Sequence, residues 1–470
     1  MTERAAGRGF QEAAQHCIEP QCQATYALSE LVYVCRRCGG LLEVRRTQVD
    51  REYARRLPGV WEARLASMDP RDRSGVWRYR ELLPFAEDVP IVTLAEGNTP
   101  LYDAPRAAAY CRIDSLLLKH QGLNPTSSFK DTGMTTAVTQ AGILGVRALV
   151  CASTGNTAAS LAAYAARAHL QCAILVPRGQ VSFAKLAQSL DYGAVVLEIE
   201  GNFDVAMNLV RELGEEPSVY LVNSINPFRI EGQKTVAVEL LEQCQWRVPD
   251  HVVVPGGNLG NSSALGKGFL ELFDLGIIER LPRLSVIQAE GAAPFTELFT
   301  RLTTERADGG FDSDLMQPVD NPHTLATAIK IGAPVSWKKS LAAVLRTGGQ
   351  ILSVSEQEIA DAKAIIGRDG IGCEPASATT VAGIKRLVSA GKIGPGEMVV
   401  AVLTGHLLKD TEYVINYYNG TLQSRHTGKV ETISSRFGNR AVQVKATKDA
   451  ILEQLRRAGN QDVFGGRRDT

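Results

Sequence analysis

The 470-residue sequence predicts an α/β protein built on doubly wound open sheets. Two observations support this prediction. From about residue 115 to residue 290, short apolar runs alternate with helical patterns, which is typical of strand–helix–strand units around a parallel sheet. In addition, 44% of the residues are hydrophobic, so a chain of this length can bury a large core and favours two or three domains over one.

The predicted strands are short apolar runs rich in β-branched residues. They cover residues 147–152, 172–177, 194–200, 218–223, 251–256, 284–290 and 397–403. Residues 157–168 and 231–244 are rich in Ala, Leu, Glu and Gln with spaced apolar positions, as in helices that pack on sheet faces. The first 45 residues differ in character, and about 40 residues at the end form a small appended region with a disordered GGRRDT terminus.

Composition and charge argue against several classes of partner. The chain carries 51 basic and 51 acidic residues, so no overall field favours nucleic acid or an anionic membrane. Residues 1–15 lack the apolar core of a secretory signal, and no apolar run is long enough to cross a bilayer. We therefore expect a cytoplasmic protein with no nucleic-acid or membrane partner.

Four of the nine cysteines cluster near the N-terminus. Cys17 and Cys22 precede Cys35 and Cys38, and tetrahedral thiolate coordination of zinc uses two pairs of this kind. The first pair is separated by four residues instead of the usual two. Structural zinc is the favoured interpretation and reduced free thiols are the alternative, whereas disulfides fit the cytosol least well. The remaining cysteines, expected to be buried structural residues, are Cys111, Cys151, Cys172, Cys244 and Cys373.

One lysine stands among small polar residues where a helix is expected to begin, in NPTSSFKDTG at residues 124–133. The positive end of a helix dipole disfavours a charged amine, which helps Lys130 to act as a nucleophile. Three strand ends are also rich in small polar residues: 153–157, 256–261 and the VLTGH segment with Thr404. Each loop taken alone also fits an ordinary tight turn.

Together, Lys130 and the three loops fit a ligand with an aldehyde, a phosphate and a ring nitrogen, features that pyridoxal phosphate combines. Lys130 would bond to the aldehyde carbon, and Asn156 would contact the ring hydroxyl. Thr404 would meet the pyridine nitrogen with a neutral hydroxyl, leaving that nitrogen largely unprotonated. The cofactor phosphate would lie on a glycine-rich loop made of Gly256, Gly257, Asn258, Leu259, Gly260 and Asn261.

The sequence from about residue 90 to 415 resembles the threonine synthases, within the tryptophan-synthase-β-like class of pyridoxal-phosphate enzymes. STGNTAAS is among the motifs that carry the resemblance, and the lysine motif NPTSSFKDTGM and the glycine-loop motif GGNLGN are shared with the wider class. NSINPFRIEGQKT and ATAIKIGAPVSW are similar to threonine synthases specifically, and YVCRRCGGLLEV resembles a zinc-ribbon-like start found in some of them. Two residues depart from the common pattern: Thr132 stands where many members have arginine, and Gln180 where many have lysine.

The resemblance implies pyridoxal-phosphate fold type II, with two doubly wound open-sheet domains and the cofactor between them. It also implies conversion of O-phospho-L-homoserine and water into L-threonine and phosphate. We expect a homo-oligomer, a dimer. The implied domains are a zinc-ribbon-like segment at 1–45, a large cofactor-binding domain at 46–137 and 226–430, a small substrate domain at 138–225, and a C-terminal extension at 431–470.

The resemblance also assigns the substrate contacts. The carboxylate loop maps onto Ser153, Thr154 and Asn156. Arg229 follows a strand end, and its forked donors suit phosphate. From the residues alone, a solvated arginine at a helix start is the commoner explanation. The full phosphate pocket maps onto Thr157, Asn223, Ser224 and Arg229.

In the implied reaction, Lys130 is released from the cofactor by the substrate and then serves as the base at Cα. Water must be excluded early and admitted late, so closure of the small domain is expected. His406, Glu374 and Ser377 are site-lining candidates. The alternatives are a serine or threonine dehydratase, a β-replacement enzyme acting on phosphoserine, and a non-catalytic pyridoxal-phosphate-binding sensor.

Overall fold

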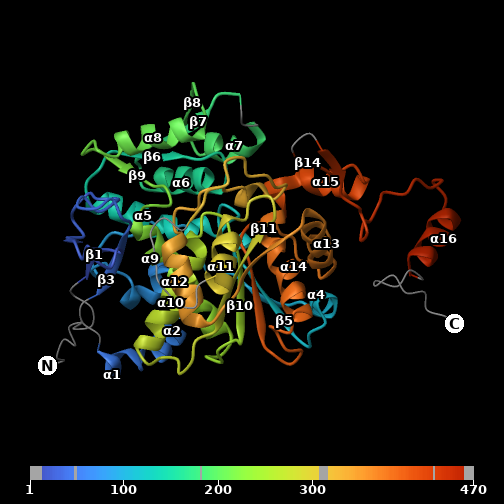
Figure 1. The fold of residues 1–470 in the computed structure, drawn as a ribbon, viewed down its shortest axis with the longest axis horizontal. Helices are drawn as coiled ribbons and strands as arrows, with labels where there is room; N and C mark the ends of the chain where they lie inside the picture. Colours follow the sequence, from blue (N-terminus) through green and yellow to red (C-terminus); the bar gives the residue numbers. More distant parts are fainter. Residues whose placement is uncertain (1–12, 47–49, 180–182, 306–315, 427–428, 460–470) are drawn as a thin grey trace.

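The computed structural model describes residues 13–46, 50–179, 183–305, 316–426 and 429–459 (Figure 1). Within these ranges the strands form four sheets. The two larger sheets are each covered by helices on both faces, which confirms the doubly wound arrangement predicted from the sequence. The C-terminal GGRRDT, predicted to be disordered, lies outside the described residues.

The strands of the larger sheet run in the order β12 (Ile351–Val354), β11 (Arg283–Ala289), β10 (His251–Pro255), β13 (Val399–Leu403), β5 (Leu116–His120) and β4 (Leu101–Asp103). All neighbours are parallel except β4 and β5 at one edge. Val252 and Val254 point into one core and Val253 into the other, because successive side chains of a strand face opposite sides. We refer to this sheet and its helices as the large-sheet unit.

The helices of the large-sheet unit divide between its two cores. The first core includes α9 (Pro227–Gln243), α10 (Gly260–Asp274), α11 (Pro294–Glu305) and α12 (Trp337–Thr347). The second core includes α4 (Pro105–Cys111), α13 (Glu356–Arg368) and α14 (Pro375–Ser389).

The smaller doubly wound sheet is parallel throughout. Its strands lie in the order β8 (Val195–Ile199), β7 (Gln171–Pro177), β6 (Ala148–Ala152) and β9 (Val219–Leu221). One face packs on α5 (Lys130–Ile143), α6 (Asn156–Arg167) and α7 (Phe183–Asp191), and the other packs on α8 (Phe203–Leu213). We refer to this group as the small-sheet unit. It lies beside the large-sheet unit (Figure 1). The polar loops meet at the junction between the two units, where Asn258 after β10 donates to Ser224 after β9 and Asn156 after β6 donates to Glu374.

A cysteine module, residues 13–46, contains a small antiparallel sheet of β1 (Ala13–Cys17), β2 (Thr25–Tyr26) and β3 (Leu42–Arg46). It touches both units. The backbone N–H of Leu221 at the edge of the small sheet donates to Tyr33 Oη at 2.7 Å. On the other side, Lys339 Nζ of α12 donates to the carbonyl of Leu42 at 2.6 Å.

The chain after β13 adds α15 (Thr411–Asn419), a hairpin of β14 (Gln423–His426) and β15 (Lys429–Thr432), and α16 (Lys448–Gly459). Figure 1 shows α16 lying apart from the rest of the chain. The remaining short helices are α1 (Arg51–Ala54), α2 (Leu57–Arg64), α3 (Pro70–Arg73), η1 (Trp77–Leu82), η2 (Gln121–Leu123), η3 (Thr327–Ile329) and η4 (Leu407–Asp410).

Every strand predicted from the sequence is present, and both predicted helices are confirmed as α6 and α9. Three strands of the larger sheet were not predicted: β4, β5 and β12. The sequence of β5, Leu-Leu-Leu-Lys-His, ends in two polar residues that are buried in the structure. Lys119 is tolerated there because its ammonium bonds to the Glu239 carboxylate of α9, a partner far away in the sequence.

Candidate active site

Lys130 is the first residue of α5, as the sequence predicted. The loop before it is fixed to the end of β13, where Phe129 N donates to Thr404 O at 2.9 Å and His406 N donates to Ser127 O at 3.0 Å. The pKa of Lys130 is lowered to about 7, mainly because burial disfavours the charged amine and secondly because the Arg229 guanidinium lies nearby. A lysine with this pKa is largely available as a neutral amine near neutral pH.

Close packing of α5 against α9 brings Arg229 near Lys130. A Cβ added to Gly232 of α9 would lie 1.9 Å from the carbonyl oxygen of Thr132, and one added to Gly133 of α5 would lie 2.6 Å from the carbonyl oxygen of Arg229. Only glycine allows the helix backbones to approach this closely. Thr132 is itself buried, and its hydroxyl donates to Phe129 O at 2.9 Å.

Arg229 is buried, with 4% of its surface exposed, so the solvated helix-start arginine suggested by the sequence is excluded. Its Nε has no hydrogen-bond partner, and none of the ion pairs among the described residues includes it. Burial lowers the pKa of Arg229 to about 10. A buried cation without a carboxylate is costly unless an anion joins it, so this guanidinium indicates an anion site.

The glycine-rich loop connects β10 to α10, as predicted. Leu259 precedes α10 in a left-handed conformation with φ of 62° and provides no side-chain cap, which leaves the first N–H groups of the helix open to an anion. Asn261 is buried, and neither atom of its amide has a hydrogen-bond partner. These features suit a phosphate held at the start of α10.

Asn258 in this loop uses its side chain to join other segments. Its Nδ2 donates to Ser224 Oγ at 2.6 Å, and its Oδ1 accepts from Val335 N at 2.6 Å. Asn258 therefore connects the glycine-rich loop to the NSINPFR and ATAIKIGAPVSW motifs. It acts as a support for the loop, and a cofactor contact from this residue would come from its backbone.

Residues 153–157 span the loop after β6 and the first two residues of α6, and Ser153, Thr154 and Thr157 are partly exposed. Asn223 lies behind it and bonds to both backbone groups of Ala152, accepting from its N–H at 3.1 Å and donating to its carbonyl at 3.0 Å. These bonds hold the end of β6 in place. They also occupy much of the Asn223 amide, which the sequence had assigned to a substrate phosphate.

Thr404 at the end of β13 belongs to a buried hydrogen-bond network. Its hydroxyl donates to Glu374 Oε1 at 3.0 Å and lies 3.1 Å from Ser377 Oγ. The other oxygen of Glu374 accepts from Asn156 Nδ2 at 3.1 Å. Burial raises the pKa of Glu374, and hydrogen bonds from Asn156 and Thr404 oppose that rise. The network thus joins two residues that the sequence assigned separately to one ring.

The structure brings Lys130, Arg229, Glu374, Asn156 and Thr404 into one group. From the sequence, Glu374 was expected only to line the site, and the ATAIKIGAPVSW segment had no predicted structural role. A glutamate before a proline at a helix start was the available signal for Glu374. His406 caps η4 by accepting from Leu408 N at 3.2 Å, a structural role, and Gln180 lies outside the described residues.

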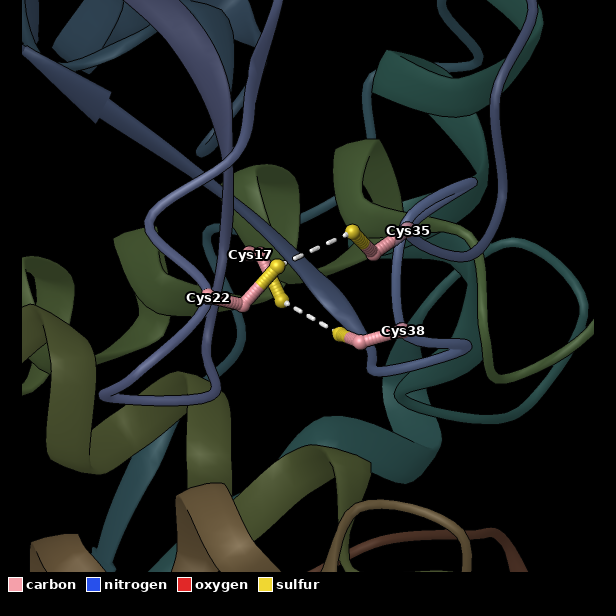
Figure 2. Close-up of side chains that lie close together, drawn as sticks. All are labelled: Cys17, Cys22, Cys35 and Cys38. Carbon is pink, nitrogen blue, oxygen red and sulfur yellow. Dashed lines mark hydrogen bonds between the residues drawn. The ribbon is translucent and has the colours of Figure 1, made fainter.

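The four N-terminal cysteines also come together, with all four sulfur atoms within 4.8 Å of one another (Figure 2). Cys17 Sγ lies 3.4 Å from Cys38 Sγ, and Cys22 Sγ lies 3.5 Å from Cys35 Sγ. Gly39 has a φ of 73°, and a Cβ on Gly40 would lie 2.6 Å from Glu19 Cγ, so this glycine pair is needed for the turn after Cys38. The other five cysteines are buried free thiols, as predicted.

No helix in the described part of the chain is long and apolar enough to span a membrane. The geometry provides one open helix start for a phosphate, one unpaired buried arginine for a second anion, and an amine of lowered pKa near that arginine. Such a group suits covalent chemistry on an anionic amino compound.

Comparisons with known proteins agree with this chemistry. The family model of pyridoxal-phosphate dependent enzymes matches residues 92–405. The chain is 46% identical over 402 residues to threonine synthase of Methanocaldococcus jannaschii, covering 85% of this chain and 94% of that protein. It is 44% identical over 405 residues to threonine synthase of Methanosarcina acetivorans, covering 85% and 93%.

Among solved structures, a fungal L-serine ammonia-lyase from Rhizomucor miehei matches with a TM-score of 0.55 at 18% identity, covering 67% of this chain and 95% of that one. A structural similarity at 18% sequence identity shows the fold alone. Together with the family match, it confirms the predicted fold class.

Proposed function

The chain belongs to the threonine synthase family of pyridoxal-phosphate-dependent enzymes, and from this premise we propose how its residues convert O-phospho-L-homoserine and water into L-threonine and phosphate. The observation that carries the assignment of residues is the buried Arg229 without an ion-pair partner, close to a lysine of lowered pKa. A substrate that carries both an amino group and a phosphate would use both residues.

The residues present fit pyridoxal phosphate. Lys130 would hold its aldehyde carbon, the open start of α10 with Asn261 would hold its phosphate, and Asn156 and Thr404 would contact its ring. The glycine-rich loop, residues 256–261, would contribute backbone N–H groups. When bound, this cofactor supplies an electron sink for the charge that develops on the substrate carbons.

The substrate phosphate would lie on Arg229, with Ser224 and Thr157 completing the pocket. Ser224 is only partly buried and already accepts from Asn258, so its hydroxyl hydrogen is available to a phosphate oxygen. Asn223 would act mainly by holding Ala152 and the carboxylate loop of Ser153, Thr154 and Asn156. The unpaired charge of Arg229 supports this choice, because a phosphate would compensate the cost of its burial.

Lys130 would move protons once the substrate is bound. Its Nζ, with a pKa near 7, would accept the proton from substrate Cα, and a second proton would leave Cβ as phosphate departs from Cγ. Protons would then return to Cγ, which becomes the methyl group, and to Cα, while water adds at Cβ and supplies the threonine hydroxyl. Arg229 holds the leaving phosphate throughout, so the same residue serves binding and departure.

We also propose that the small-sheet unit closes over the site. The proposed small domain, residues 138–225, contributes Asn156, and the proposed large domain, residues 46–137 and 226–430, contributes Thr404. It also contributes Lys130, the first residue of α5, whose later turns pack on the small sheet. Closure would exclude water while the phosphate leaves. The remaining proposed boundaries are the cysteine segment at 1–45 and the C-terminal extension at 431–470.

For the cysteine module we propose one structural zinc ion on Cys17, Cys22, Cys35 and Cys38. Tetrahedral Zn–S bonds of about 2.3 Å place sulfur atoms about 3.8 Å apart, which agrees with sulfur atoms that all lie within 4.8 Å. The module contacts the small-sheet unit through Tyr33 and the large-sheet unit through Leu42. The metal would therefore stiffen a brace between the two units.

Two further proposals concern the cell and the assembly. A cytoplasmic location is supported by nine cysteines of which none forms a disulfide, since oxidising compartments favour disulfides. A homodimer is proposed as the solution state, and light scattering on the purified protein would measure its mass.

A substrate panel tests the activity. The protein should release phosphate from O-phospho-L-homoserine and form threonine, and it should be far slower with serine, with threonine, and with phosphoserine plus a thiol. Deamination of serine or threonine as the faster reaction would favour the dehydratase alternative. Efficient replacement of the phosphate of phosphoserine would favour the β-replacement alternative, and cofactor binding with no turnover would favour the sensor.

A further inference from the structure

We propose that Glu374 is a positioning residue that orients Asn156 and Thr404 through a single carboxylate. These two residues are the proposed contacts of the cofactor ring, so the inference rests on that part of the proposed function. Asn156 begins α6 in the small-sheet unit, whereas Glu374 and Thr404 belong to the large-sheet unit. One side chain thus joins the two units inside the site.

The backbone around Glu374 is arranged for this purpose. Glu374 immediately precedes α14, a position from which side chains commonly cap a helix, yet it makes no cap hydrogen bond. Its carboxyl group turns into the site instead, where Cβ on Gly405 would lie 2.4–2.6 Å from the carboxyl atoms. Glycine at residue 405 therefore leaves the space that the carboxyl group occupies.

Hydrogen-bond directions follow from the chemistry of the partners. An ionised carboxylate only accepts, so Asn156 must present Nδ2 to it, and the second hydrogen of that nitrogen remains available to a ring oxygen. The Thr404 hydroxyl donates its only hydrogen to Glu374. Glu374 thereby fixes which way the Asn156 amide and the Thr404 hydroxyl face.

Ser377 completes the arrangement at Thr404. Its Oγ accepts from the backbone N–H groups of Thr404 at 2.8 Å and Gly405 at 3.2 Å, so its own hydrogen is free for Thr404 Oγ1 at 3.1 Å. The Thr404 oxygen then offers the cofactor ring only a lone pair, so a pyridine nitrogen in contact with it would carry a proton, in contrast to the largely unprotonated nitrogen expected from the sequence. Burial raises the pKa of Glu374, and the cations that oppose this rise are Lys130 from α5 and Lys409 from η4.

The test uses three variants of the full chain: Glu374→Gln, Glu374→Ala and, as a matched control, Asp361→Asn. Asp361 is a buried carboxylate of α13 that bonds to Gln357 and Arg436, away from these residues. Apoprotein is titrated with pyridoxal phosphate to obtain the dissociation constant. Visible absorbance and circular dichroism of the loaded protein are then recorded against pH, and far-ultraviolet circular dichroism checks the fold.

Glu374→Ala removes both bonds and should weaken cofactor binding about tenfold or more. Glu374→Gln keeps the shape but presents an amide N–H to Thr404, so affinity should stay within about threefold while the visible circular dichroism and its pH dependence change. Asp361→Asn should match the parent in every readout. If Glu374→Ala does not fold, the spectra of Glu374→Gln decide the question.

The inference is overturned if both Glu374 variants match the parent in every readout while borohydride reduction labels the parent at Lys130. The proposed function would then still stand. A parent that is not labelled at Lys130 would contradict the cofactor contacts and, with them, the role of Glu374. A change in affinity for Glu374→Ala with no spectral change in Glu374→Gln would reduce Glu374 to a packing residue and would also overturn the inference.

Discussion

Replacing Arg229 with methionine should remove activity without removing stability. Methionine retains an unbranched apolar stem but has no charge, and Arg229 has no ion-pair partner among the described residues. Loss of charge-assisted hydrogen bonds to phosphate costs about 1.5–3 kcal/mol, which corresponds to a roughly 10- to 200-fold lower kcat/KM for O-phospho-L-homoserine. Since the phosphate is also the leaving group, kcat should fall as well as apparent binding.

The same helix offers a matched control in Lys234. It is another buried cation of α9, but it pairs with Glu231 at 2.6 Å and Glu271 at 2.8 Å. It lies five residues after Arg229, about 140° around the helix. Lys234→Met removes one of the two lysines that pair with buried Glu231, leaves Lys267 as the other, and should lower the free energy of unfolding by about 1–3 kcal/mol. Arg229→Met should leave the free energy of unfolding unchanged or raise it, because an uncompensated buried charge is removed.

The assay pairs steady-state phosphate release with urea unfolding of the apoprotein for both variants. Arg229→Lys keeps the charge but loses the forked donors, so it should recover only part of the activity. The reasoning is refuted if Arg229→Met turns over O-phospho-L-homoserine within about twofold of the parent, a difference of about 0.4 kcal/mol. It is equally refuted if Arg229→Met destabilises the apoprotein as much as Lys234→Met does, because Arg229 would then be a structural cation.

Three further outcomes are expected. The rate at which the apoprotein captures pyridoxal phosphate should increase as pH rises and level off above about pH 7, because the lowered pKa of Lys130 makes the neutral amine dominant there. A rate that levels off only near pH 10 would contradict this expectation. Chelation of zinc, followed by elemental analysis and thermal unfolding, should lower Tm and weaken protection of the Leu221 amide from hydrogen exchange, whereas protein purified without stoichiometric metal would rule the zinc site out. Gly232→Ala should destabilise the protein by about 1–3 kcal/mol or more in urea unfolding, because its Cβ would lie 1.9 Å from the carbonyl oxygen of Thr132. The control is Gly142→Ala on α5, where no atom lies within 4 Å of the added Cβ, and this variant should be neutral or stabilising.

Local sequence patterns predicted the strands and the polar loops at their ends, since apolar runs and small residues determine these features over a few positions. Lys130 at the start of α5 is an example of a site residue found in this way. β5 was missed because the burial of Lys119 depends on Glu239, which lies on a helix far along the chain. A local pattern carries no information about such a partner.

Long-range contacts also explain which features of the candidate site could not be predicted from the sequence. Arg229 looked like a common surface residue, and only the packing of α5 on α9 at Gly133 and Gly232 shows that it is buried. Glu374 bonds to Asn156 across 218 positions of sequence, so its link to that residue emerges only once both units are folded. Asn258 was assigned to the cofactor from its loop, but its side chain bonds to Ser224 and Val335.

The most direct test of the account is turnover of O-phospho-L-homoserine in water enriched in heavy oxygen, with mass analysis of both products. If phosphate leaves Cγ by cleavage of the carbon–oxygen bond and water then adds at Cβ, threonine should carry one heavy oxygen in its hydroxyl group. The released phosphate should carry none. Homoserine accompanied by labelled phosphate would mean that the phosphate ester is simply hydrolysed. Either that result or a 2-oxo acid in place of threonine would contradict the account.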